Sequence, residues 1–299
     1  MEEISILQIY SIFSALKIGR DLNNGDKIDT FTFAKTQFAM QERHRNHDIY
    51  FQEQAACCRK YYIPYIKEHS DITLGETCSV LEVGCGIGGG ISVFAEAGCK
   101  VMGVDIHAPS IRRAEQNFAS RGLSGEFKCL DIFEWNDFSQ TFDLIIMHDT
   151  FEHIPQKEKL LLHLKNFLKD DGILYVGFPA WQMPFGGHQQ MAKSRIASRL
   201  PYIHLLPRPL FKAVFKAFGE TDRSLQTFLE IRDTRVTIES FSRLVERTGY
   251  RVIDKTWYLI NPNYEIKFGL KPRKLPALLG AIPYVRDFFA TTCYYLLAK

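Results

Sequence analysis

Hydrophobic residues follow two alternating spacings along residues 78–178. Short runs rich in β-branched residues predict strands, and longer segments with apolar positions three or four apart predict helices between them. Strands and helices that alternate in this way form a parallel sheet, so the pattern predicts a doubly wound α/β fold. The predicted strands are Ser79–Val83, Lys100–Ile106, Glu126–Leu130, Phe142–Met147 and Ile173–Phe178, with helices at 109–120 and 156–168.

The segment in front of this sheet follows the helical spacing. Ile4–Ile18, Phe31–Met40 and Asp48–Glu68 are amphipathic stretches, the last with Pro64 as an expected kink. Residues 1–75 therefore predict a helical N-terminal cap.

Beyond the fifth strand, residues 180–228 are too long for an ordinary connection and predict a functional insertion. A capped helix is expected at Thr237–Gly249, followed by two antiparallel strands at 250–259 and 264–270. Residues 271–299 combine a basic cluster with an apolar pattern over 275–298 that predicts an amphipathic helix. The expected organisation is thus a cap (1–75), a sheet domain (76–270) containing the insertion, and a basic tail (271–299).

A glycine cluster follows the first predicted strand, where a helix N-terminus and bare backbone N–H groups favour a nucleotide. Gly84, Gly86 and Gly89 fit G-x-G-x-x-G, with Asp105 about 20 residues on, as in dinucleotide-binding folds. Glu82 with Gly84, Gly86 and Gly88 equally fits E-x-G-x-G-x-G. The spacing of the glycines leaves both interpretations open.

The residues after the later strands favour one of them. Asp105 ends the second strand, Asp131 ends the third in Cys-Leu-Asp-Ile-Phe, and the fourth leads from Phe142-Asp-Leu-Ile to Glu152-His-Ile-Pro. With the glycine motif, this order resembles the class I S-adenosylmethionine (SAM) methyltransferases, in particular the small-molecule branch that includes the ubiquinone-biosynthesis O-methyltransferases. The resemblance is good over residues 78–178 and holds elsewhere only in outline.

The resemblance implies a mostly parallel, seven-stranded Rossmann-like sheet with an antiparallel last strand, and SAM as the cofactor. It implies Asp105 on the ribose and Asp131 beside the adenine amino group. The helical cap commonly covers the cofactor in this family, so Arg43, His44, His47 and Tyr50 are candidates for closing the site. The residues expected to bind SAM are Glu82, Gly84, Cys85, Gly86, Gly88, Asp105, Ile106, Asp131, Ile132 and His148.

Composition changes this picture little. A chain of 299 residues, 46% of them hydrophobic, can bury a full core, and we expect a soluble, globular protein. Seven cysteines without framework spacing indicate reduced thiols, and the acidic start argues against a signal peptide, so a cytoplasmic location is expected. No C-x-x-C occurs, and Asp149 with Glu152 alone make a poor cation site, so no metal is expected.

Charge is unevenly distributed. Residues 193–299 hold 19 Lys and Arg against 9 Asp and Glu, and the rest of the chain holds 18 against 25, which gives net charges of +10 and −7. The basic half with its aromatic residues is suited to an anionic acceptor, to peripheral contact with a membrane or to RNA, whereas a solvated helix face would explain the same bias. His148-Asp149-Thr150-Phe151 differs from the Asn/Asp-Pro-Pro-Tyr/Phe typical of DNA-base methyltransferases, so DNA is not an expected partner. The pattern favours no particular oligomeric state.

The expected reaction is transfer of a methyl group from SAM to a small-molecule or lipid-like acceptor at a hydroxyl oxygen. Alignment and exclusion of water supply most of the catalysis, and a hydroxyl acceptor adds the need for a base. His148, His153 and His188 are the candidate bases, with His188 favoured because Gly186-Gly187 permits close approach. An NAD-dependent oxidoreductase and a non-catalytic SAM-fold binding protein are the alternatives.

Overall fold

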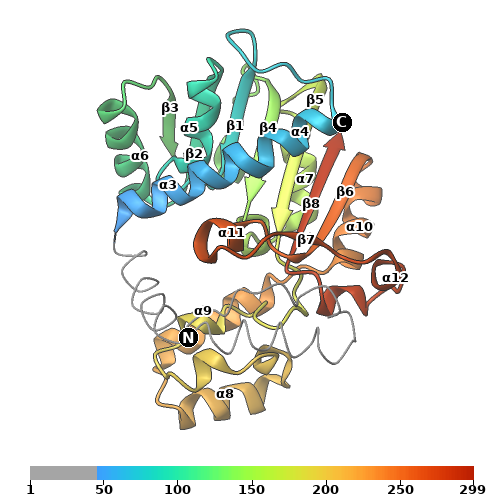
Figure 1. Cartoon of the computed structure of the whole chain (residues 1–299). Coiled ribbons are helices and arrows are strands. Elements are labelled where there is room, and N and C mark those ends of the chain that lie inside the picture. Colours follow the sequence, from blue (N-terminus) through green and yellow to red (C-terminus); the bar gives the residue numbers. More distant parts are fainter. Residues whose placement is uncertain (1–45) are drawn as a thin grey trace. The chain divides into compact units, whose positions relative to one another are not determined.

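The computed structural model describes residues 46–299, so the helices predicted at Ile4–Ile18 and Phe31–Met40, and candidates Arg43 and His44, lie outside the described residues. The chain forms two compact units. The larger consists of His47–Met183 and Asp233–Lys299, and the described part of the smaller consists mainly of Pro184–Arg232 (Figure 1).

The larger unit is built on one eight-stranded sheet with the order β3-β2-β1-β4-β5-β8-β6-β7. Strands β1 to β5 are parallel, and β8 pairs antiparallel with both β5 and β6. The strands are β1 (Ser79–Val83), β2 (Lys100–Asp105), β3 (Glu126–Cys129), β4 (Phe142–His148), β5 (Leu168–Phe178), β6 (Arg251–Ile260), β7 (Arg273–Lys274) and β8 (Thr292–Ala298).

This sheet confirms the doubly wound α/β fold with an antiparallel strand near its end, but the predicted count of seven strands is wrong. The eighth strand is β7, a two-residue edge strand that pairs with β6. A segment this short, with Lys271-Pro-Arg-Lys around it, carries no alternation of apolar and polar residues from which a strand could be predicted.

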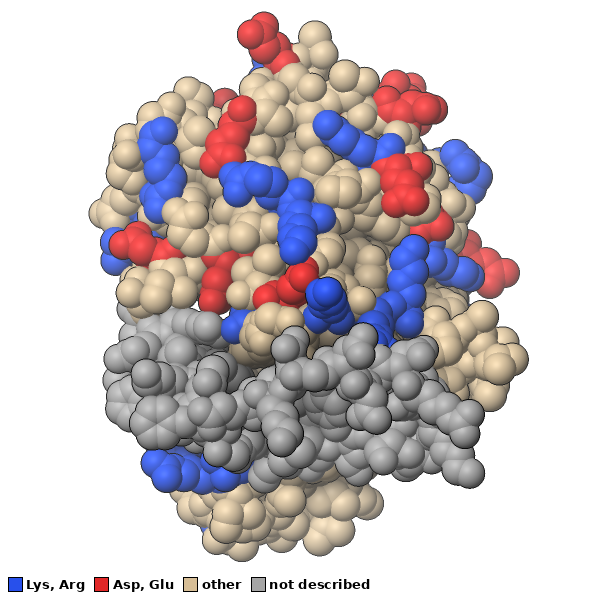
Figure 2. Space-filling view, viewed as in Figure 1, with Lys and Arg blue, Asp and Glu red and all other residues tan. Residues whose placement is uncertain are grey.

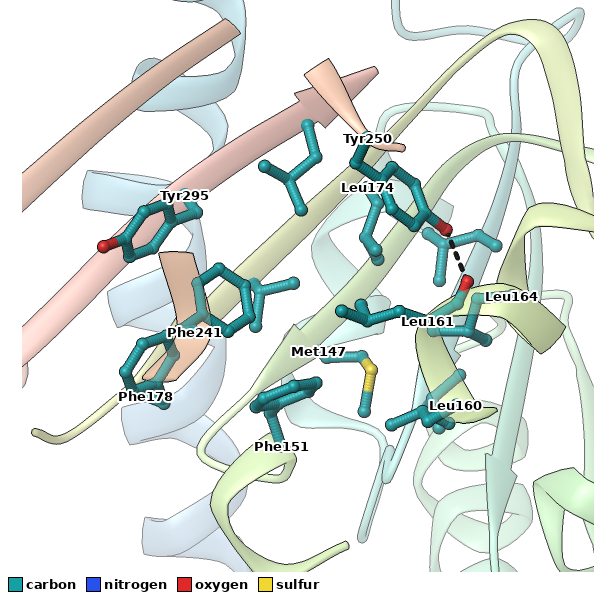
Figure 3. Close-up of a cluster of buried hydrophobic side chains, with 14 of the residues drawn as sticks. Met147, Phe151, Leu160, Leu161, Leu164, Leu174, Phe178, Phe241, Tyr250 and Tyr295 are labelled. Carbon is teal, nitrogen blue, oxygen red and sulfur yellow. Dashed lines mark hydrogen bonds between the residues drawn. The ribbon is translucent and has the colours of Figure 1, made fainter. Parts of the chain in front are cut away.

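Helices cover both faces of the sheet, and neighbouring strand residues point into two different cores. Val80 and Leu144 pack in one core with α5, whereas Leu81 and Ile145 pack in the other with α7 and α10. In the second core Tyr250 donates a hydrogen bond to the carbonyl of Leu161 at 2.9 Å (Figure 3). The helices of this unit are α3 (His47–Cys57), the π-helical η2 (Cys58–Tyr62), α4 (Ile63–His69), α5 (Gly89–Glu96), α6 (Ala108–Ser120), α7 (Lys157–Lys165), α10 (Ile238–Arg247), α11 (Asn263–Phe268) and α12 (Ala277–Gly280), with 3₁₀ turns η3 (Ile132–Glu134), η4 (Phe151–His153) and η8 (Arg286–Phe288).

The structure overturns two predictions at the carboxyl end. Residues 264–270, predicted as a strand, form helix α11, which ends at Gly269 with a left-handed φ of 71°. The helix predicted over 275–298 is also wrong, because its last residues are strand β8. Six of the seven residues of β8 are buried, so both of its faces lie in the core, and a strand covered on both sides shows a continuous apolar run without alternation.

The smaller unit has a hydrophobic core of its own. Helices α8 (Arg208–Ala217) and α9 (Asp222–Asp233) pack around Phe211, Phe215 and Phe228. Three short 3₁₀ turns precede them, η5 (Gln189–Met191), η6 (Ala197–Arg199) and η7 (Ile203–Leu205). The buried Gln189 amide donates to the carbonyl of Pro184 at 2.7 Å and thereby closes the connecting loop on itself. Among residues 46–299, no helix combines the length and apolar character that crossing a membrane requires.

Candidate functional site

A cavity of about 610 Å³ lies at the carboxyl ends of β1, β2 and β4, and every residue that lines it belongs to the larger unit. Parallel sheets bind ligands at this edge, where the strand order reverses on either side of β1. The lining residues are Tyr50, Glu53, Gln54, Tyr62, Glu82–Gly84, Gly86, Gly90, Val104–Ile106, Leu130–Phe133, His148–Thr150, His153–Gln156, Asn263, Ile266 and Lys267.

The glycine loop between β1 and α5 needs its glycines for different reasons. Gly84, Gly86 and Gly88 all have left-handed φ values, of 76°, 53° and 83°. A Cβ at Gly84 would lie 2.4 Å from the side chain of Thr150, whereas one at Gly86 would meet nothing within 4 Å. Gly86 is therefore the position at which the loop leaves room for a ligand.

Asp105 is held rigidly at the end of β2. Its Oδ2 accepts a hydrogen bond from the Gly86 N–H at 2.9 Å, and its Oδ1 accepts one from the His107 N–H at 2.8 Å. A carboxylate has about four acceptor positions, so two remain for hydroxyl groups of a ligand. Ile106 follows with 75% of its surface exposed and gives the cavity an apolar wall.

Asp131 lies at the rim of the cavity after β3. Its Oδ1 accepts a hydrogen bond from the Phe133 N–H at 3.0 Å and caps the short helix η3. Ile132 is buried beside it and also lines the cavity. Asp131 therefore caps a helix and faces the cavity at the same time.

Glu82 is buried beneath the glycine loop. Burial, with a smaller contribution from the charge of Asp105, raises the pKa of the Glu82 carboxyl to about 8. Its Oε2 has no hydrogen-bond partner among the described residues. The carboxyl therefore keeps its proton near neutrality and can donate a hydrogen bond into the cavity.

Cys85 and Gly88, also expected at the cofactor, do not line the cavity. The Cys85 side chain is 1% exposed and packs toward β2, where a Cβ at Gly103 would lie 2.7 Å from its sulfur. Gly88 caps α5, and a Cβ there would lie 3.2 Å from that of Ala114. Both residues shape the loop from behind.

His148 ends β4 in an aromatic wall. Its Nδ1 lies 3.1 Å from the Tyr175 hydroxyl, and its ring is 4.1 Å from that of Tyr62. Burial lowers the pKa of His148, although the Asp149 carboxylate, 3.6 Å from Nε2, acts in the opposite direction. The imidazole is therefore neutral, with its buried Nε2 lacking a hydrogen-bond partner among residues 46–299.

The turn after β4 places further titratable groups close together. Asp149 lines the cavity with a left-handed φ of 50°, which is uncommon outside glycine. His153 also lines it, and burial lowers the pKa of His153. Glu152 is buried with its Oε1 3.7 Å from His153 Nε2, and burial and the charge of Asp149 raise the pKa of Glu152 well above its usual value.

His188 belongs to the smaller unit, where it has a left-handed φ of 54° and follows Gly187. Its N–H donates to the carbonyl of Phe185 at 3.0 Å. A Cβ at Gly187 would lie 2.2 Å from that of His204, so this glycine allows the backbone to pass the imidazole closely. His188 is thus absent from the described cavity lining, whereas His148 and His153 are in it.

Several lining residues were not predicted. Tyr62 lies in the π-helical turn η2 and donates a hydrogen bond to Asn263 Oδ1 at 3.2 Å. Asn263, Ile266 and Lys267 come from α11, which the sequence indicated as a strand. Pro262 followed by a residue pattern ending at Gly269 was the available signal for a short helix. Of the expected cap residues, Tyr50 lines the cavity and His47 does not.

Comparison with known proteins finds relatives of parts of this chain. A family described as "Methyltransferase domain" matches residues 74–207. Phosphoethanolamine N-methyltransferase 1 of Triticum aestivum is 35% identical over 103 residues, 34% of this chain and 20% of that protein. A ubiquinone biosynthesis O-methyltransferase of Actinobacillus pleuropneumoniae is 29% identical over 118 residues, 38% of this chain and 50% of that protein. The matches thus span half or less of the length of these relatives.

Solved structures match over most of the chain at low identity. A S-adenosylmethionine-dependent methyltransferase from Clostridium acetobutylicum has a TM-score of 0.52 at 13% identity, covering 89% of this chain and 98% of the other. The plantazolicin methyltransferase BpumL, solved in complex with a triazolic desmethylPZN analog and SAH, has a TM-score of 0.50 at 14% identity, covering 89% of this chain and 91% of the other. At such identity these structures show a shared fold.

Proposed function

We propose that this chain is a class I SAM-dependent methyltransferase and transfers the methyl group of SAM to a small-molecule acceptor. The proposal rests on one observation above all: the glycine loop, Asp105 and Asp131 line a single cavity at the carboxyl ends of adjacent parallel strands. In that cavity SAM supplies an already activated methyl group. The protein has to bind it, align the acceptor and exclude water.

The order of the strands supports this proposal over a nicotinamide oxidoreductase. A dinucleotide-binding fold places a parallel sixth strand at the end of the order 3-2-1-4-5-6. Here the antiparallel β8 lies next to β5, with β6 beyond it. Asp131, at the rim of the cavity, is also not part of the dinucleotide fingerprint.

We assign the donor to the β1–β3 side of the cavity. Gly84 lines the cavity, Gly86 lets the ligand approach the backbone, and Asp105 accepts hydrogen bonds from the ribose hydroxyls. Ile106 and Ile132 contribute apolar contacts to the adenine, with Asp131 beside its amino group. Cys85 and Gly88 support the loop without facing the ligand.

We assign the acceptor's chemistry to the β4 side, with a hydroxyl oxygen as the expected methylation site. Of the three candidate bases, His153 lines the cavity as a neutral imidazole. His148 is also neutral, but if Tyr175 donates to its Nδ1, its Nε2 carries the proton and cannot accept another. His188 remains the candidate that the smaller unit contributes. The O- and N-methyltransferase relatives support either acceptor atom.

We further propose that the smaller unit selects the acceptor. It follows β5, has its own core around the buried Phe211 and Phe215, and exposes Lys212 and Lys216 on α8. Exposed basic side chains suit an anionic acceptor. The seven cysteines, all in the described part, are free thiols, which supports a reducing compartment such as the cytoplasm.

Calorimetry tests the donor assignment directly. We expect heat of binding with SAM and with its demethylated product SAH, and none with NAD. Binding of NAD without binding of SAM would refute the proposal. Binding of SAM without transfer to any of a panel of phenols, quinol precursors, amines and sugars would favour a non-catalytic SAM-binding protein.

A further inference from the structure

The segment between β7 and β8 has its apolar and charged residues arranged opposite to those of an ordinary surface loop. Leu278 is 85% exposed, Tyr284 61%, Ile282 47% and Val285 41%. Asp287 in the same segment is fully buried. Large apolar side chains gathered at the surface mark a site that interacts with another protein or with a membrane.

Arg286 and Asp287 hold this arrangement in place. Arg286 donates through Nε to Glu239 Oε1 at 2.9 Å and through Nη1 to the carbonyl of Gly280 at 3.1 Å. Asp287 Oδ1 accepts a hydrogen bond from the Ile238 N–H, in the first turn of α10, at 2.8 Å. The apolar side chains cannot turn inward without breaking these contacts.

The backbone also holds the side chain of Tyr284 at the surface. Its φ of 65° lies in the left-handed region, which bulky residues seldom adopt. Its N–H donates to Glu239 Oε1 at 2.9 Å, so the same buried carboxylate fixes Tyr284 and Arg286. The Tyr284 side chain is thus directed outward by a rigid backbone.

Charge identifies the kind of surface that this segment fits. Between Glu265 and Asp287 the sequence contains five Lys or Arg residues and no Asp or Glu. Lys271, Arg273 and Lys274 are exposed, the last two on edge strand β7. Where Figure 1 shows α12, Figure 2 shows an uncharged projection with basic side chains next to it.

We propose that residues 271–285 dock this protein on the surface of an anionic lipid bilayer. Lys271, Arg273 and Lys274 would lie among the anionic headgroups, and the side chains of Leu278, Ile282, Tyr284 and Val285 would enter the acyl boundary. A second copy fits less well, because a symmetric dimer through this patch would bring the two basic clusters together. The docking does not depend on methyl transfer.

Vesicle co-sedimentation of the full chain without SAM tests the proposal. We expect binding to phosphatidylcholine vesicles in which about a third of the lipid is phosphatidylglycerol, and little binding to phosphatidylcholine alone. Binding should weaken as salt rises, because the Debye length falls from about 10 Å at 0.1 M to about 3 Å at 1 M.

Two variants measure separately what the basic and the apolar side chains contribute to vesicle binding. One basic residue near such a surface is worth about fivefold in binding, so Lys271→Gln with Arg273→Gln and Lys274→Gln should lower partitioning about 100-fold. Leu278→Ser with Tyr284→Ser should lower it by at least about tenfold at constant charge. The matched controls, Arg112→Gln with Arg113→Gln on α6 and the 48% exposed Leu162→Ser on α7, should bind as the unaltered protein does.

The proposal is overturned if the unaltered protein does not sediment with the anionic vesicles, or if the control variants lose as much binding as the test variants. Circular dichroism of each variant separates lost docking from lost folding. Sedimentation equilibrium tests the alternative of a dimer. If the protein is a dimer that Leu278→Ser dissociates, and if it does not bind the vesicles, this surface is an interface between copies and the lipid proposal is wrong.

Discussion

The two sides of the cavity treat their polar groups differently. On the β1–β3 side Asp105 accepts two backbone hydrogen bonds and Asp131 accepts one. On the β4 side His148 Nε2 is buried without a hydrogen-bond partner among the described residues, as are both carboxyl oxygens of Glu152, which does not itself line the cavity.

This difference separates binding from proton chemistry in every group named here except Glu82, whose buried carboxyl lies on the β1–β3 side and also has a raised pKa. A carboxylate already fixed by backbone N–H groups needs no rearrangement to accept a ligand's hydroxyl groups. Buried groups without partners have shifted pKa values, and such shifts are typical of sites that move protons. Variants of residues in each group test this division.

The largest expected effect is that of Asp105→Ala on the donor side. Loss of two charge-assisted hydrogen bonds at about 1.5 to 3 kcal/mol each should weaken SAM binding about 10² to 10⁴-fold in calorimetry. Asp105→Asn keeps an acceptor oxygen, so its affinity for SAM should lie between that of the unaltered protein and that of Asp105→Ala. An affinity equal to that of the unaltered protein would show that the donor binds elsewhere.

Replacing His188, the candidate base of the smaller unit, should lower kcat without affecting SAM affinity. We expect His188→Ala to reduce kcat by about 10² to 10⁴-fold and to flatten the acidic limb of the pH profile. Hydrogen exchange of the variant should show whether the Gly186-Gly187 loop keeps its course.

Parallel His148→Ala and His153→Ala variants test the other two candidates. Burial lowers the pKa of both imidazoles below the usual value of 6.5. If either one is the base, activity should therefore fall only below pH 6.5, where that imidazole becomes protonated. If His188→Ala turns over normally, that residue is structural.

Glu82→Gln should change how stability depends on pH. The folded chain keeps the Glu82 proton up to about pH 8, whereas the unfolded chain loses it near 4.5. The free energy of unfolding therefore falls as pH rises through this window, by about 3 kcal/mol up to pH 7. Glu82→Gln should remove this slope in urea titrations from pH 5 to 8, and an unchanged slope would contradict the shifted pKa.

The smallest effects concern the glycine loop, where two neighbouring variants separate packing from binding. Gly86→Ala should cost only about 1 to 2 kcal/mol of stability, which is the penalty of a left-handed φ. It should weaken SAM binding, because the added Cβ would lie in the open space that the loop leaves for the ligand. Gly84→Ala adds the clash with Thr150, and overpacking typically costs about 1 to 3 kcal/mol more. Thermal melts and calorimetry on both variants compare the two losses.

The sequence predicted β1, β2, β4, β5 and the cavity edge because each of these strands is a short apolar run with a clear break after it. In β3, Glu126-Phe-Lys-Cys, charged and apolar residues alternate instead. Glu82, Gly84, Gly86, Asp105, Ile106, Asp131, Ile132 and His148 all line the cavity as expected from their order along the chain. Their individual roles toward SAM stay predictions.

The carboxyl end could not be predicted in the same way. A strand buried on both faces, such as β8, lacks the period that tells it from a helix. The error extended to the site, since Asn263, Ile266 and Lys267 reach the cavity only because α11 is helical. The aromatic wall around His148 brings together Tyr62, Tyr175 and Tyr294, and spacing along the chain says nothing of contacts between such distant residues.

The position of β8 has a consequence for how this protein is made. Ile173 of β5 pairs with Ala298 of β8, about 120 residues later in the chain, and Arg251 of β6 pairs with the same residue. A ribosome adding about 5 to 20 residues per second needs roughly 6 to 24 seconds for that interval. During that time the nascent chain exposes strand edges that pair readily with other chains. We therefore expect the sheet to close only after β8 leaves the exit tunnel, and the nascent protein to rely on chaperones until then.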